Sequence, residues 1–341
     1  MDPFVSVIIP TFNEEKYIAS LLENILLQDY PVDRLEVFII DGMSKDRTRG
    51  IIEEYHQNHP HINLLLNKRR FVSYALNAGI KKSKGEVVIR MDAHSEYPDD
   101  YISKLARYLF ELDADNVGGI WITKPGNDSL KANAIAAALS SVFGVGDAQY
   151  RLGVNKVCKA DTVPFGCFRR SLFDRIGMFD EELLRNQDDE FNARITQNGG
   201  SIYLVPDVEI IYYARRDITS LLRMFYQYSF FKPLVNMKLK RPATIRQFIP
   251  PLFVLYLLLG WISIFISPYL FYIYLAGIGI YLFANMFFTL KSTIDHGKAF
   301  LIFYLPWIFL MQHLTYGIGY LIGIVNFVLF KKSPTAIKTT R

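Results

Sequence analysis

Apolar and polar positions follow two different periods over roughly the first ninety residues. Four short runs rich in Val, Ile and Leu have the pattern of buried strands, and the segments between them repeat apolar residues every three or four positions, as helices do. The strands are expected at 4–10, 35–40, 62–66 and from residue 85 onward. Alternation of strand and helix with short connections predicts an α/β fold with a mostly parallel, Rossmann-like sheet.

Later segments have a different character. The alanine-rich residues 130–143 predict a helix, and the glycines that follow predict a mobile loop over 147–159. A further strand is expected at 208–213. At 218–231, apolar and aromatic residues are mixed with bases, which favours an interfacial helix at a membrane surface. A packed core helix is the alternative for this segment.

Long apolar segments near the end of the chain predict membrane helices. No residue from 249 to 290 carries a formal charge. Spans are expected at 250–266 and 269–290, and residues 299–330 form a third apolar segment after a polar loop at 291–298. The third segment is longer than one span needs and shorter than two spans need. The protein is therefore expected to cross the membrane two to four times, and a single tilted span is favoured for residues 299–330.

Four domains follow from this pattern. They are a catalytic domain (1–217), a basic juxtamembrane segment (218–248), transmembrane helices (249–330) and a basic tail (331–341).

Basic residues gather beside the apolar segments, although the net charge is only +5. Residues 218–248 contain no acid, and the tail is also basic. The bases concerned are Arg223, Lys232, Lys238, Lys240, Arg241 and Arg246, with Lys331, Lys332, Lys338 and Arg341 in the tail. The first 217 residues are acidic overall, so the partner expected is a membrane surface and no nucleic acid. The positive-inside rule predicts a multi-pass protein of the inner or plasma membrane with a cytoplasmic catalytic domain.

Polar side chains stand where the predicted strands end. Asn13 and Glu14 follow the first strand, Asp41 ends the second, and Asp92 and His94 follow the fourth. Ligands of parallel sheets bind beyond the carboxyl ends of the strands. Where the chain leaves the pleat, Asp92 and His94 can converge on one cation, and this pair suits Mg²⁺ or Mn²⁺ that also holds substrate oxygens.

The order of these motifs resembles the family 2 glycosyltransferases of GT-A fold. The resemblance covers about the first 230 residues and rests on Ser6–Glu15, Asn77–Gly79, Gly85–His94, Phe165–Arg170 and Asn186–Phe191. Asp92-Ala93-His94 in place of the usual Asp-x-Asp, Val142–Gly146 and Asp161–Gly166 are similar to the branch that makes succinoglycan-type exopolysaccharides. The resemblance implies sugar transfer from a nucleotide sugar, usually a UDP-sugar, with inversion at the anomeric carbon.

The resemblance also implies roles for single residues. Asp41 would contact the nucleobase or ribose, and Lys68 and Arg70 would contact the base or the phosphates, although a solvated basic turn is the alternative for 68–70. Phe165 and Gly166 would line the acceptor side. The other residues of the nucleotide-sugar site would be Pro10, Asn13, Glu14, Asn77, Arg90 and Asp92.

The acceptor hydroxyl must lose a proton, and a nearby carboxylate can accept it. The resemblance places this base at Asp188, with Asp189 and Glu190 as backups, because Gln187 stands where the family has a glutamate. Three acids at a helix start also have a purely structural explanation, since they favour the helix dipole. Arg194, one turn after Glu190, is expected to form an ion pair with it.

Three functions are compatible with these observations. The leading one is a membrane-bound, metal-dependent inverting glycosyltransferase that adds one sugar to a lipid-linked saccharide in exopolysaccharide or cell-surface glycan synthesis. The second is a polyprenyl-phosphate sugar synthase, whose phosphate nucleophile needs no base, so Asp188 weighs against it. The third is a non-catalytic nucleotide-sugar-binding membrane protein, which the joint presence of Asp41, Asp92, His94 and Asp188 disfavours.

Overall fold

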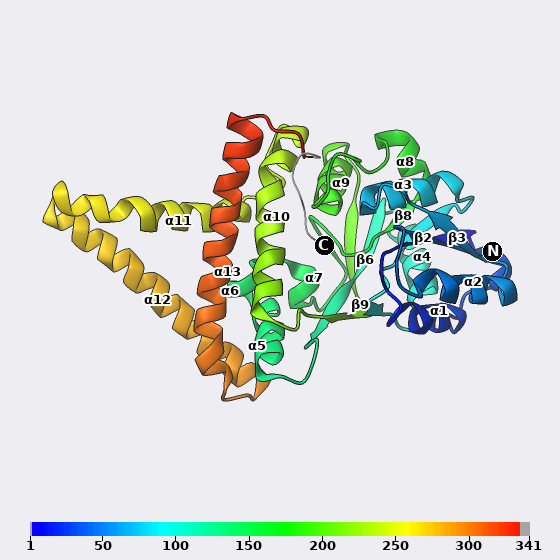
Figure 1. Cartoon of the computed structure of the whole chain (residues 1–341), viewed down its shortest axis with the longest axis horizontal. Coiled ribbons are helices and arrows are strands. Elements are labelled where there is room, and N and C mark those ends of the chain that lie inside the picture. Colours follow the sequence, from blue (N-terminus) through cyan, green and yellow to red (C-terminus); the bar gives the residue numbers. More distant parts are fainter. Residues whose placement is uncertain (1, 335–341) are drawn as a thin grey trace. The chain divides into compact units, whose positions relative to one another are not determined.

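The computed structural model describes residues 2–334, and the chain forms two compact units (Figure 1). The first unit combines residues 1–122 with 153–212, and the second combines 123–152 with the chain from 213 onward. A single boundary at residue 217 was expected, and the structure corrects it. Residues 123–152 leave the sheet and pack with the C-terminal helices, so that the ring of Phe143 lies 4.8 Å from that of His313.

Four parallel strands form one half of the sheet in the first unit, in the order β3-β2-β1-β4. They are β1 (Val5–Thr11), β2 (Leu35–Asp41), β3 (Ile62–Leu66) and β4 (Val87–Arg90). The register pairs Thr11 with Asp41 at their carboxyl ends. The parallel sheet predicted from the hydrophobic pattern is therefore confirmed, and its carboxyl edge carries Asp41 and Arg90.

The other half of the sheet is built from strands of later sequence, and β8 joins it antiparallel to β4. These strands are β5 (Ser95–Glu96), β6 (Asn116–Lys124), β7 (Cys158–Lys159), β8 (Cys167–Arg169) and β9 (Ile202–Tyr213). The helices of this unit are α1 (Ile18–Leu26), α2 (Thr48–Asn58), α3 (Val72–Lys82), α4 (Tyr101–Glu111), α8 (Arg170–Ile176) and α9 (Gln187–Gln197), with a 3₁₀ turn at Val32–Arg34.

The core of the first unit lies between the sheet and its helices. Ile9, Ile39 and Ile89 on adjacent strands, Leu22 of α1 and Leu105 of α4 are all completely buried in one cluster. Apolar side chains at alternate strand positions meet apolar helix faces there, which explains why the loops at the strand ends are left to carry the polar residues.

The second unit is helical. Its elements are α5 (Leu130–Leu139), α6 (Val142–Val145), α7 (Gln149–Leu152), α10 (Ile218–Leu239), α11 (Ile249–Gly260), α12 (Pro268–His296) and α13 (Leu301–Gly323), with short turns at Arg246–Phe248 and Trp261–Phe265 and a π-helical end at Ile324–Leu329. The helix expected at 130–143 is broken at Ser140–Ser141. The loop expected at 147–159 contains α7 and β7, and the polar loop expected at 291–298 is helical up to His296.

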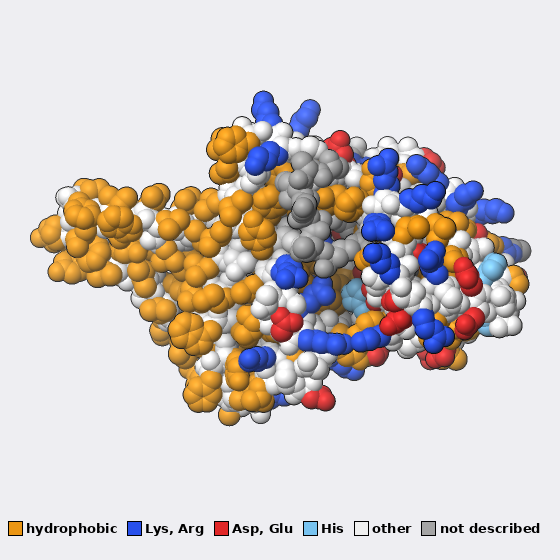
Figure 2. Space-filling model, in the orientation of Figure 1, with side chains coloured by type: hydrophobic (Ala, Val, Ile, Leu, Met, Phe, Trp, Pro, Cys, Tyr) orange, Lys and Arg blue, Asp and Glu red, His pale blue; other side chains and the backbone are white. Residues whose placement is uncertain are grey.

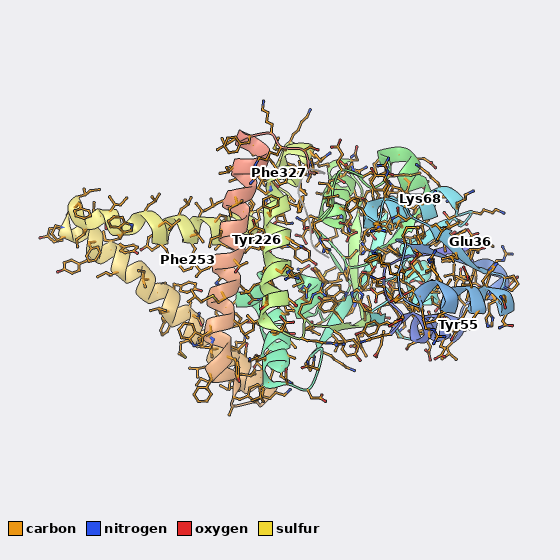
Figure 3. The ribbon with its side chains drawn as sticks, viewed as in Figure 1. Glu36, Tyr55, Lys68, Tyr226, Phe253 and Phe327 are labelled. Atoms are coloured by element: carbon orange, nitrogen blue, oxygen red, sulfur yellow. The ribbon has the colours of Figure 1, made fainter. Side chains whose placement is uncertain are left out.

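Helices α10 and α13 pack closely along each other (Figure 1). Glycines allow this approach, because a Cβ atom at Gly319 would lie 2.2 Å from Oγ of Ser229, and one at Gly323 would lie 2.2 Å from the carbonyl oxygen of Phe230. Phe327, in the π-helical end that follows α13, has its ring centre 5.1 Å from that of Phe230. Figure 3 labels Phe327 and, on α10, Tyr226. The segment expected at 218–231 is thus a helix packed against α13, and it extends to Leu239.

Three helical segments in the described part of the chain are long and apolar enough to cross a membrane: Arg246–Phe265, Pro268–His296 and Leu301–Leu329. Helices α11 and α12 project away from α10 and α13 and meet at a tip (Figure 1). They contact each other through the stacked rings of Phe253 and Tyr281 at 4.2 Å and through the Tyr256 hydroxyl, which donates to the Tyr274 carbonyl at 2.7 Å.

The close α10–α13 packing predicts opposite effects of two Gly→Ala substitutions. Gly323→Ala would force the helix backbones apart and cost about 1–3 kcal/mol. Gly279→Ala in α12 meets nothing within 4 Å, and removing a helix glycine there would stabilise by up to ~1 kcal/mol. Thermal unfolding of both variants in detergent measures the difference. Equal melting temperatures for the two variants would contradict the packing.

Candidate active site

The loops after β1 and β2 are tied together at the carboxyl edge of the sheet. The amide of Asn13 donates to Oγ of Ser44 at 2.8 Å, and the amide of Glu14 donates to Oγ1 of Thr48 at 2.8 Å. In return, the side-chain oxygen of Asn13 accepts from the amide of Lys45 at 2.9 Å. Asn13 therefore braces the loop after β2, and its positive φ of 56° is part of that turn.

Asp41 ends β2 as a fully buried carboxylate. Its Oδ2 accepts from the amide of Ser44 at 2.9 Å and lies 3.8 Å from Nε of Arg49. Its Oδ1 is buried and has no hydrogen-bond partner in the described chain. A buried acceptor without a donor costs about 1–3 kcal/mol, and an N–H or O–H group of a ligand would remove that cost.

The basic loop after β3 lies at the same edge of the sheet. The amide of Asn67 donates to the carbonyl of Asp41 at 2.8 Å, and Asn67 also accepts from the amide of Arg69 at 3.1 Å. Lys68 and Arg70 are exposed on this anchored loop (Figure 3 labels Lys68). The structure thus brings positive charge near Asp41, as a nucleotide site requires.

Arg90, at the end of β4, binds two carboxylates from distant parts of the chain. Its Nη1 donates to both oxygens of Asp188, at 2.5 and 2.6 Å. Its Nε and Nη2 donate to Asp92 at 3.1–3.2 Å. Arg90 as a whole residue is 7% exposed, and its guanidinium carbon lies 5.6 Å from the centre of the Phe165 ring. Arg90, Asp92, Asp188 and Phe165, which come from three separate motifs, form one cluster.

The electrostatics of this cluster follow from burial and charge. Burial raises the pKa of the Asp188 carboxyl, and the carboxylates of Asp92 and Asp189 raise it further, whereas Arg90 opposes the shift. Burial alone would lower the pKa of Arg90, but Asp188 and Asp92 raise it above its usual value. Arg90 therefore stays charged. The side chain of Asp188 is 41% exposed, so a second molecule can reach it.

Asp92 and His94 are two positions apart in the turn after β4, and each contacts a different residue. The amide of Asp92 donates to the hydroxyl of Tyr97 at 2.6 Å, which fixes the turn after β4. Nδ1 of His94 lies 3.6 Å from a carboxylate oxygen of Glu14, and the imidazole is 41% exposed. The turn thus places a carboxylate, an imidazole and Glu14 at one edge of the sheet.

The start of α9 separates the three candidate bases. Glu190 is buried and receives two hydrogen bonds from Arg194, both at 2.8 Å, which confirms the expected ion pair. Asp189 is half-buried and Asp188 faces Arg90. Of the three acids, Asp188 combines exposure with a position inside the polar cluster.

Four other expected site residues have structural contacts. The carboxamide of Asn77 donates to the carbonyl of Phe179 at 2.9 Å and accepts from its amide at 3.1 Å, so Asn77 holds the segment before α9 against α3. Phe165 is buried under Arg90, and Gly166, at φ 36°, has no room for a Cβ atom beside Phe168. Pro10 lies inside β1, where it faces Ile40 of β2.

Tyr97 was missed by the sequence analysis. Its hydroxyl contacts the backbone of Asp92, and its ring lies 6.0 Å from that of Phe165. The available signal was an aromatic residue three positions after His94, which says nothing by itself about a hydrogen bond back to Asp92.

Residues 6–177 match the family described as Glycosyl transferase family 2. The chain belongs to this family. It is 30% identical over 243 residues to a dolichyl N-acetyl-alpha-D-glucosaminyl phosphate 3-beta-D-2,3-diacetamido-2,3-dideoxy-beta-D-glucuronosyltransferase of Methanococcus voltae. The alignment covers 69% of this chain and 74% of that protein. It is 28% identical over 246 residues to the succinoglycan biosynthesis protein ExoA of Rhizobium meliloti, with coverage of 72% and 73%.

The fold of this family 2 glycosyltransferase also has a solved counterpart. Mannosyltransferase PcManGT from Pyrobaculum calidifontis, solved in complex with GDP-Man and Mn²⁺, aligns with a TM-score of 0.58 over 97% of this chain and 89% of the other, at 22% identity. At that identity the likeness concerns the fold alone. The GT-A fold and the resemblance to the succinoglycan branch, both expected from the motifs, are confirmed.

The ion pair of Glu190 with Arg194 predicts a specific loss of stability for this glycosyltransferase. Glu190→Gln leaves the Arg194 guanidinium largely buried without a counter-charge, and breaking such a pair costs about 3–5 kcal/mol. Asp189→Asn, the neighbouring control, should change stability by less than ~0.5 kcal/mol. Denaturant unfolding of both variants at neutral pH makes the comparison. An unchanged free energy of unfolding for Glu190→Gln would show that this ion pair does not stabilise the fold.

Proposed function

We propose that this chain is a membrane-bound, inverting glycosyltransferase that moves one sugar from a nucleotide sugar to a lipid-linked saccharide. The observation that carries the proposal is the cluster in which Arg90 joins Asp92, on the expected donor side, to the exposed carboxylate of Asp188. The name of the Methanococcus relative specifies a lipid-linked sugar acceptor, and that of the Rhizobium relative specifies succinoglycan synthesis. The first name supports a lipid-linked acceptor, and the second supports a role in surface glycan synthesis.

The donor would bind across the carboxyl edge of β1, β2 and β4. The unpaired oxygen of Asp41 would accept from the nucleoside, and the exposed Lys68 and Arg70 would approach the phosphates. A UDP-sugar is our first choice because the resemblance implies it. The mannosyltransferase of similar fold was solved with GDP-Man, so guanosine donors belong in the test.

Asp92 and His94 would hold a divalent cation together with the diphosphate, the role that the resemblance implies for this pair. The described residues contain no group of three or more His, Cys, Asp or Glu side chains that would hold a metal by themselves, so donor oxygens and water would complete the ligand set. A carboxylate and a neutral imidazole are accepted ligands of Mn²⁺ and Mg²⁺. When bound, such a cation would stabilise the negative charge of the leaving diphosphate.

The transfer itself needs one proton to move. The acceptor hydroxyl attacks the anomeric carbon as the bond to the nucleoside diphosphate breaks, and its proton goes to an oxygen of Asp188. Asp188 suits this role because 41% of its side chain is exposed and its carboxylate stands inside the polar cluster, where an acceptor hydroxyl could reach it. Arg90 would orient the carboxylate, since both Asp188 oxygens accept from its Nη1.

A donor panel identifies the substrate most directly. The full-length protein in detergent, supplied with Mn²⁺, should slowly hydrolyse one nucleotide sugar in the absence of acceptor. UDP-, GDP- and dTDP-sugars are compared by release of nucleoside diphosphate. Release from none of them, together with no nucleotide binding by calorimetry, would contradict the proposed activity.

Asp188→Asn tests the base. The amide keeps the size of the side chain but cannot take the proton, and a general base contributes ~10²–10⁴-fold. Turnover should fall by about that factor while calorimetric nucleotide affinity stays near that of the parent. Asp189→Asn is the matched control and should retain most activity.

Two results would argue against this assignment. If Asp189→Asn is the inactive variant, the base is one residue further along α9. If neither variant is impaired, no carboxylate base is used, and the polyprenyl-phosphate sugar synthase becomes the better explanation, because an ionised phosphate needs no base.

Chelation tests the metal. EDTA should abolish transfer, and added Mn²⁺ or Mg²⁺ should restore it. Asp92→Asn should weaken nucleotide binding in the presence of Mn²⁺ much more than in its absence, whereas His94→Asp restores the commoner Asp-x-Asp pattern and should keep measurable activity. Unchanged transfer after chelation would remove Asp92 and His94 from a metal-binding role.

A further inference from the structure

Helix α13 is apolar enough to cross a membrane, but its neighbour α10 is not. Gly319 and Gly323 of α13 lie against Tyr226 and Phe230 of α10. The hydroxyl of Tyr320 accepts from the side chain of Asn236 at 3.0 Å. These contacts place α10 beside the middle and the C-terminal part of α13, so the two helices must occupy the same depth relative to a bilayer.

Helix α10 carries charges at that depth. Arg223 and Lys232 flank the contact with Gly319 and Gly323, and Lys238 and Lys240 follow at the end of the helix. If α13 crossed the bilayer, α10 would take these bases into the hydrocarbon core, where charged side chains are rare and costly. Lys232 is buried in the helix packing. At a membrane surface the other three bases, Arg223, Lys238 and Lys240, would lie near anionic lipid headgroups.

The burial of α13 fits a helix with one face in lipid. Exposed apolar side chains of α13 and its π-helical end are spaced by three, four or seven residues, which places them on one stripe: Phe303, Trp307, Met311, Ile318, Ile322, Val325 and Leu329. The opposite side is packed within the unit, where Leu305 and Phe309 are completely buried. In the most apolar part of α13, 39% of the residues are buried, against 11% in each of the other two candidate spans.

The α11–α12 hairpin has the features of a true membrane insertion. Residues 249–290 carry no formal charge, and hydrophobic side chains cover the visible face of the hairpin (Figure 2). The apolar segment Arg246–Phe265 has 20 residues, which corresponds to about 30 Å of helix, the thickness of the hydrocarbon core. Near the tip, Trp261, Phe265 and Tyr269 are exposed, as is usual at a membrane–water interface.

We propose that α11 and α12 cross the bilayer as a hairpin, while α13 lies along one membrane surface beside α10, with its Phe303–Leu329 stripe in the lipid interface. This arrangement leaves four groups of bases on one side, as the positive-inside rule demands. They are the bases before α11, Lys291 in the last turns of α12, Lys298 after α12, and Lys331 and Lys332 after α13. A third crossing by α13 would put Lys331 and Lys332 on the opposite side. The proposal rests on the second unit alone and does not depend on the catalytic assignment.

Cysteine labelling of the full chain in intact bacterial cells tests the topology. Ser267→Cys, at the tip of the hairpin, should react with a membrane-impermeant maleimide added outside. Ser333→Cys, after α13, should react only after the membrane is permeabilised. The unsubstituted protein, which contains Cys158 and Cys167, measures the background labelling.

Labelling of Ser333→Cys in intact cells would show that α13 crosses the membrane. Failure of Ser267→Cys to label before permeabilisation, with labelling afterwards, would show that the hairpin does not cross. Either result overturns the proposal.

Fluorescence quenching by brominated lipids measures the depth of α13 itself and detects a re-entrant α13, which labelling at its end would miss. Three variants with one tryptophan each are compared, all with Trp121 and Trp261 replaced by Phe. The first keeps the native Trp307. The other two carry Trp307→Phe together with either Ile318→Trp or Leu329→Trp. The protein is reconstituted in vesicles of phosphatidylcholine and phosphatidylglycerol. A helix in the membrane plane places all three at similar, shallow depth. A crossing or re-entrant helix would place position 318 up to ~16 Å deeper than position 307, since 11 residues rise by that distance, and that result would overturn the proposal.

Discussion

The polar centre of the first unit depends on the buried charge of Arg90. A guanidinium at the end of a central strand is stable only if carboxylates meet it, because an unpaired buried charge costs several kcal/mol. Asp92 supplies one partner from the turn after β4, and Asp188 supplies the other from the start of α9. The ion pairs thus connect a strand end and a helix start that are 98 residues apart in the chain.

This constraint explains how other polar residues near the site are used. For Asp188 to reach Arg90, the segment before α9 must be fixed, and Asn77 fixes it by hydrogen bonds to both backbone groups of Phe179. On the other side, the Tyr97 hydroxyl holds the backbone of Asp92. Asn77 and Tyr97 are therefore occupied in positioning the segments that carry Asp188 and Asp92. Asp41 keeps a buried oxygen without a hydrogen-bond partner among the described residues, which a ligand would satisfy.

Much of the first unit could be predicted because its signals are local. Strands β1 to β4 follow from short β-branched runs, and the carboxyl-edge rule brings Asp41 and Asp92 to one side of the sheet. The pair of Arg90 with Asp188 could not be predicted, since nothing in either local sequence specifies a partner so far away. The excursion of residues 123–152 into the second unit was missed for the same reason: an alanine-rich helix does not indicate which surface it packs against.

The second unit shows where hydropathy alone gives an incomplete answer. Hydropathy treats α13 and α12 alike, because both are long and apolar. The difference between them comes from the neighbour: α12 presents most of its surface outward, whereas Gly319 and Gly323 fasten α13 to a helix that carries Arg223 and Lys232. An apolar helix can enter the hydrocarbon only as deeply as the helix it is packed against. In the arrangement proposed for α13, close packing through two glycines would keep α13 at the depth of the charged helix α10. Three apolar segments would then be compatible with basic clusters on one side of the membrane.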